Sequence, residues 1–185
     1  MSNPTAPRNG AAAPPAAPAV PAALPVVSAI LATAISAAEK RASPADVAHG
    51  VIAALRHLRA TADEEAGYAM AAAIDTAVRQ HLLAGGMADL RLNGHGPAAA
   101  ALPPAGPGAA AASAILQSAA DSCLAINAHA SDNEPLEIAV GALTRQIARH
   151  LGGEPGWEVV ERELHRPILH HGGGPILPFR GVTVH

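Results

Sequence analysis

The chain has 185 residues and a formal charge of −3, and half of its residues are hydrophobic although only 2% are aromatic. Much of this hydrophobic fraction is alanine, the strongest helix former, whereas sheets usually depend on β-branched and aromatic residues. The composition therefore favours helices around one core of ordinary size or two very small ones. The acidic balance leaves no basic stripe for a phosphate backbone, which argues against a nucleic-acid partner.

A tail rich in alanine and proline opens the chain. Residues 1–24 have little to bury, so we expect a disordered tail or spacer. The next stretch, residues 26–35, is uncharged and apolar, and it partly resembles the hydrophobic region of a secretory signal. It is too short to span a bilayer, and prolines interrupt the sequence before it. We therefore expect a soluble cytoplasmic protein without a membrane span, with secretion as the alternative.

The spacing of aliphatic residues predicts a first helix over about residues 25–41. The residues expected on one side of it are Val27, Ile30, Leu31, Ala34 and Ile35. Lys40 and Arg41 are expected in its last turn, where the helix dipole favours cations.

Two further helix starts follow closely in the sequence. Ser43 suits an N-cap, with Pro44 at the first helical position and Asp46 at the third. Thr61 and Glu64 have the spacing of a second capping box. Both helices keep aliphatic residues on one side, and residues 25–92 together form a first helical unit. The short connections predict antiparallel neighbours.

Glycine and proline then interrupt the chain at residues 93–108, which we interpret as a linker. A second unit, residues 109–166, follows with three predicted helices over about 109–129, 134–151 and 157–164. Cys123, the single cysteine, is expected as a small buried side chain on the first of these, and it excludes an internal disulfide. The fold predicted from the sequence is an all-α bundle of five to six short helices.

Short sequence matches link the two units. The tetrapeptide at residues 28–31 recurs at 113–116, and the pattern at 73–82 resembles that at 142–151. Duplication of a helical hairpin unit explains both matches, and convergence between alanine-rich helices explains them as well. The final segment, residues 167–185, is too apolar for a solvated tail and too rich in glycine and proline for a helix.

Ten histidines make metal binding the first chemistry to consider. Glu161 and His165 are four residues apart on one predicted helix, and His170 and His171 follow nearby. These side chains could supply nitrogen and oxygen ligands to zinc or nickel. An exposed polar cluster is the alternative interpretation, and we expect no bound cofactor.

The segment from Arg145 to His150 contains an arginine and a histidine separated by four residues. This spacing resembles that of the helical HEPN-type ribonucleases. The resemblance covers six residues and implies that Arg145 and His150 would act on a scissile phosphate across a dimer interface.

A non-enzymatic function in helix-mediated assembly, with a protein partner or with another copy of the chain, is the leading hypothesis. Aromatic anchors are common at protein interfaces, and Trp157 and Phe179 both lie near the end of the chain. The expected partner-binding residues are Trp157, Ile168, Leu169, Ile176, Leu177 and Phe179. The same segment could instead pack onto its own bundle. The alternatives are a HEPN-like or metal-dependent enzyme and a small nucleic-acid-associated regulator.

Overall fold

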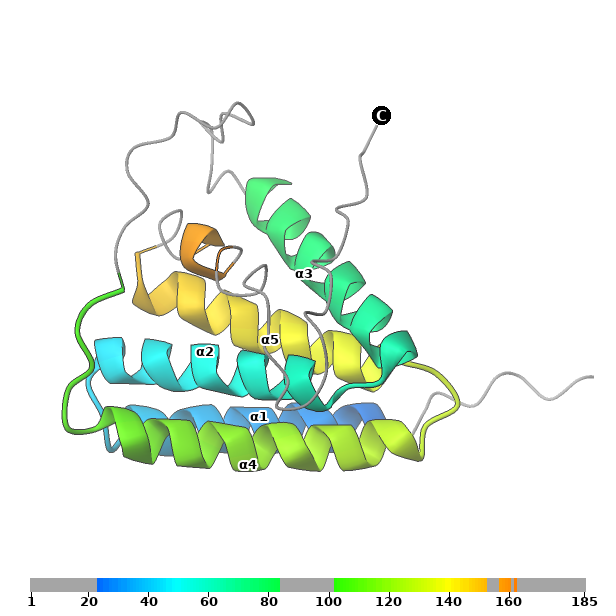
Figure 1. Cartoon of the computed structure of the whole chain (residues 1–185), viewed down its shortest axis with the longest axis horizontal. Coiled ribbons are helices and arrows are strands. Elements are labelled where there is room, and N and C mark those ends of the chain that lie inside the picture. Colours follow the sequence, from blue (N-terminus) through cyan, green and yellow to red (C-terminus); the bar gives the residue numbers. More distant parts are fainter. Residues whose placement is uncertain (1–22, 84–101, 153–156, 161, 163–185) are drawn as a thin grey trace, which may run out of the picture.

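The computed structural model describes residues 23–83, 102–152, 157–160 and 162. These residues form five α-helices in chain order (Figure 1): α1 (Ala23–Glu39), α2 (Pro44–Thr61), α3 (Glu64–Leu83), α4 (Ala109–Ala128) and α5 (Glu134–His150). Residues 157–160 add a short helical turn, and no strand occurs in the described part of the chain. The all-α prediction is confirmed.

The helices pack as a bundle in which α2 is central (Figure 1). Helix α2 runs antiparallel to α1 and in the same direction as α4, and α2 and α4 share the most extensive contact. Helix α5 lies against α1, α2 and α3, and α3 crosses the bundle at an angle. Residues on both sides of the predicted linker therefore build one packed structure.

Local sequence signals explain where the helices begin and end. At α2 both halves of the expected capping box are present, because the Ser43 hydroxyl accepts from the Asp46 backbone N–H and the Asp46 side chain accepts from the backbone of Ser43. Two expectations were wrong in detail. Helix α1 ends at Glu39, so Lys40 and Arg41 follow its last turn. The Asp63 carboxylate, rather than Thr61, accepts from a backbone N–H at the start of α3.

One hydrophobic cluster joins residues from all five helices. Of the side chains predicted to lie on one side of the first helix, Val27, Leu31 and Ala34 belong to this cluster, and Ile30 and Ile35 pack against it partly buried. The largest fully buried side chains are Leu55, Leu58, Leu116, Leu136, Leu143, Ile147, Val27, Val47, Val51, Val140, Val159 and Val160. Cys123 is also buried, as expected, and burial raises the pKa of its thiol to about 11.

Small residues allow α2 and α4 to approach closely. A Cβ atom placed on Gly50 would lie 2.8 Å from the backbone carbonyl carbon of Ala112 and 3.0 Å from its Cβ. No side chain larger than hydrogen fits at residue 50 without moving one of the helices. Gly50 therefore fixes the position of α4 against the core.

The end of the linker is held to the start of α2 by a buried carboxylate. Asp46 is 3% exposed, and one of its oxygens accepts a 2.7 Å hydrogen bond from the Gly106 N–H. Burial raises the pKa of Asp46, but the hydrogen bonds from Ser43, Gly106 and Gly108 outweigh this effect and leave the pKa below its usual value. On α2, His49 also lies 2.5 Å from the carbonyl oxygen of Pro103.

Candidate interaction surface

The outward sides of α1 and α4 carry almost no charge. Each helix has a single charged residue, Glu39 at the end of α1 and Asp121 in α4. A helix on a protein surface usually carries charged residues on its outward side, and a helix without them is usually buried. The exposed positions here are mainly small: Ser28, Ala29, Ala32 and Thr33 on α1, and Ala110, Ala111, Ala114, Ser118, Ala125 and Ala128 on α4. We call these ten residues the α1/α4 face.

Helix α4 illustrates this property most clearly. Among the described helices it alone is long and apolar enough to cross a membrane by length and composition, yet only 28% of its most apolar 18-residue window is buried in the bundle. A core helix of a soluble protein passes the same test, so this is weak evidence for a membrane span. Because α4 packs against α1 and α2, its buried side is occupied by the bundle. Its outward side is uncharged apart from Asp121, which lies 2.5 Å from His57 of α2.

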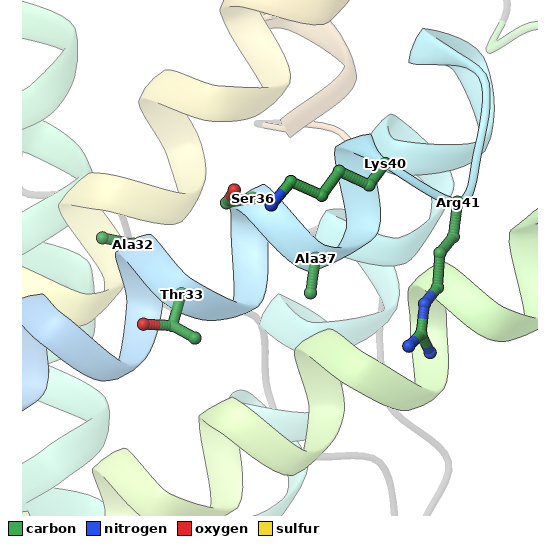
Figure 2. A pocket seen from close by; sticks show the side chains of 6 residues that line it. All are labelled: Ala32, Thr33, Ser36, Ala37, Lys40 and Arg41. Atoms are coloured by element: carbon green, nitrogen blue, oxygen red, sulfur yellow. The ribbon is translucent and has the colours of Figure 1, made fainter.

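An open depression lies at the C-terminal half of α1 (Figure 2). It is lined by Ala32, Thr33, Ser36, Ala37, Lys40 and Arg41. The first four side chains are small and leave space above the helix. Lys40 and Arg41 complete the lining: in Figure 2 the Lys40 side chain runs along the helix toward Ser36, whereas Arg41 extends toward α4. We call this feature the α1 depression.

A polar cluster next to the depression ties α1 to α5. One oxygen of Glu39 accepts a 2.8 Å hydrogen bond from the Gln146 side chain and pairs with the guanidinium of Arg149. His150 lies 3.4 Å from the same oxygen, and its Nε2 is 2.7 Å from the Gln146 amide nitrogen. Since the amide nitrogen must donate, His150 Nε2 accepts this bond when the ring is neutral. The cluster fixes the end of α1 against α5.

The structure gives Arg145 and His150 different surroundings. Arg145 is exposed, whereas the side chain of His150 is 12% exposed and lies within the polar cluster. Burial is the largest cause that lowers the pKa of His150, and Arg149 lowers it further, while Glu39 partly opposes both. The two residues predicted by the HEPN resemblance are therefore not presented together on one exposed surface of α5.

The remaining predicted site residues cannot all be placed. Glu161, His165, His170 and His171 lie outside the described residues, as do Ile168, Leu169, Ile176, Leu177 and Phe179. Within the described ranges no three His, Cys, Asp or Glu side chains are grouped closely enough to hold a metal ion. Trp157 is 4% exposed, so in this structure it is a buried side chain and presents no anchor at the surface.

Sequence reasoning missed the α1/α4 face and the polar cluster. The absence of charge in residues 23–38 and 109–120 was visible in the sequence, and it is the signal that could have pointed to the face. The cluster joins residues more than a hundred positions apart, and no local pattern encodes that contact. Comparison with protein-family models, with curated proteins and with solved structures finds no match to this chain.

Proposed function

We propose that this protein functions in assembly, binding a protein partner or another copy of itself through the α1/α4 face. The observation that supports the proposal is the near absence of charge on the outward sides of two adjacent helices. Burying alanine costs no side-chain rotamer entropy, and small side chains let helix backbones approach closely. Such a face is suited to packing against another helix and has no reactive groups that would indicate catalysis.

The proposal can be tested by placing charge on the face. In the variant A29R/A114R, arginine replaces one exposed alanine on α1 and one on α4. Both residues are good helix formers, so the fold should be kept while a partner is repelled. The matched control is Q80R at an exposed position in the last turn of α3. The mass of each assembly is measured by light scattering after size exclusion. The samples are the full chain and the complexes captured with it from its source cells.

We expect the complex to be lost in A29R/A114R and kept in Q80R. Equal masses for the wild type and both variants would show that the face is not an interface. If A29R/A114R instead loses binding to lipid vesicles without any change in protein mass, the face binds membranes and the proposal is wrong.

The C-terminal segment is a second proposed contact for the same partner. Its candidate anchors are Ile168, Leu169, Ile176, Leu177 and Phe179, whereas the buried Trp157 is omitted. Removing residues 167–185 should weaken partner binding and leave the unfolding midpoint of the bundle unchanged. A large fall in stability with unchanged binding would show instead that the segment packs on its own chain.

A further inference from the structure

Two exposed surfaces of the bundle carry opposite charges. The first is the α1 depression, in which small side chains lie next to the cations of Lys40 and Arg41. The second is the first turn of α3, where Glu64 and Glu65 are exposed and the neighbouring Tyr68 is 64% exposed. Tyrosine is among the residues that contribute most to binding at protein interfaces. We call Glu64, Glu65 and Tyr68 the acidic end of α3.

Helix geometry is compatible with a contact between the two surfaces. Ser36 and Lys40 are four residues apart on α1, and Tyr68 and Glu64 are four residues apart on α3. Both separations are close to one helical turn, about 5.4 Å. An α3 helix lying antiparallel to α1, with Glu64 at the level of residue 40, therefore places Tyr68 at the level of Ser36, next to the side chain of Lys40. In this orientation the positive N-terminus of α3 also lies near the negative C-terminus of α1.

The two surfaces cannot meet within one molecule. The C-terminal end of α1 and the N-terminal end of α3 lie at opposite ends of the bundle (Figure 1). From this separation and the complementary charges, we infer that the α1 depression of one copy binds the acidic end of α3 of a second copy, head to tail. The inference rests on the proposed assembly function and identifies the partner as this chain itself. A head-to-tail contact does not close after two copies, so it forms rings or open chains.

Charge reversal on each surface provides the test. Light scattering after size exclusion should show that the full-length wild type grows beyond a dimer as its concentration rises. The variants K40E/R41E and E64K/E65K should each need at least about tenfold more protein to assemble. When mixed, they should associate again, because each variant's altered surface now complements the other's. The control E134K/E137K makes the same charge change on the first turn of α5 at the same end of the bundle and should assemble like the wild type.

Lysines in the first turn of α3 also oppose the helix dipole, so helix content is measured by circular dichroism. If E64K/E65K loses helix content, the variant Y68S tests the same contact without changing the charge of the first turn of α3. We expect Y68S to weaken assembly as well. Assembly of K40E/R41E or of Y68S at wild-type concentrations would overturn the inference, as would a monomeric wild type. Loss of assembly in A29R/A114R but not in the charge variants would leave the proposed function standing and remove only this contact.

Discussion

The close approach of α2 and α4 at Gly50 gives a quantitative test of the fold that supports the surface. In the variant G50A, the new methyl group would lie 2.8 Å from the Ala112 carbonyl carbon and 3.0 Å from its oxygen. These are backbone atoms, so no rotation of a side chain can relieve the contact. The helices must separate, and the packing around them must change.

Two opposing effects set the size of the change. Alanine in place of glycine inside a helix stabilises the folded state by about 0.5–1 kcal/mol. Forcing an extra methyl group into a packed contact costs about 1–3 kcal/mol. Because the contact here is with backbone, we take the upper part of that range and expect G50A to lower the free energy of unfolding by about 1–2 kcal/mol.

Gly141 on α5 provides the matched control. A Cβ there would meet the Arg145 guanidinium at 3.3 Å, which is the far end of a flexible and exposed side chain. The variant G141A should therefore gain about 0.5–1 kcal/mol from its helix propensity. Urea unfolding, with a slope of about 2 kcal/mol/M, should place the two midpoints about 1 M apart. If G50A is as stable as G141A, the backbones of α2 and α4 do not approach as described.

Three further predictions concern ionisable groups. Folding lowers the pKa of Asp46, so the ionised Asp46 stabilises the folded state above pH 3.8, the pKa in the unfolded chain. This stabilisation is lost as the pH falls through the folded pKa. The urea midpoints of the wild type and D46N should therefore converge between pH 5 and pH 2. The pKa of His150 is also lowered in the folded state, so the unfolded chain binds a proton more readily at this residue. The free energy of unfolding should therefore fall as the pH drops below 6.5. In H150Q this free energy should depend less on pH between pH 7 and pH 5. Burial keeps the Cys123 thiol protonated, with a pKa of about 11, so a thiol reagent at pH 8 should label it only in urea. Labelling of Cys123 at the rate of an exposed thiol in the native protein would contradict its burial.

Sequence periodicity predicted the helices because each helix encodes its own buried side. The N-cap of α2 was identified to the residue, since Ser43, Pro44 and Asp46 act within a single turn. At α3 the same reasoning chose Thr61, but this hydroxyl bonds back to the carbonyl of His57 and belongs to the end of α2. Two helices separated by two residues offer competing capping residues, and the sequence alone does not decide between them.

The pairing of helices could not be read from the sequence. The contact between Gly50 and Ala112 depends on two small residues in a chain where small residues are common. The bond from Gly106 to Asp46 was hidden for a similar reason, because Asp46 already had a local explanation as a residue of the capping box. Alanine-rich helices specify little about which of their sides meets which neighbour, since alanine is accommodated on a buried side and an exposed side alike.

The dimensions of the α1/α4 face bear on how strong an assembly it can support. Helices of 17 and 20 residues are about 26 and 30 Å long, and each is about 10 Å wide, so their outward sides offer roughly 600 Å². A standard interface buries about 800 Å² on each partner. A face of this size with few large side chains favours weak and reversible association, because small residues give close packing but little apolar area. Complementary charges at the border of the face then mainly determine which partner binds and in which orientation. We assign this role to Lys40 and Arg41.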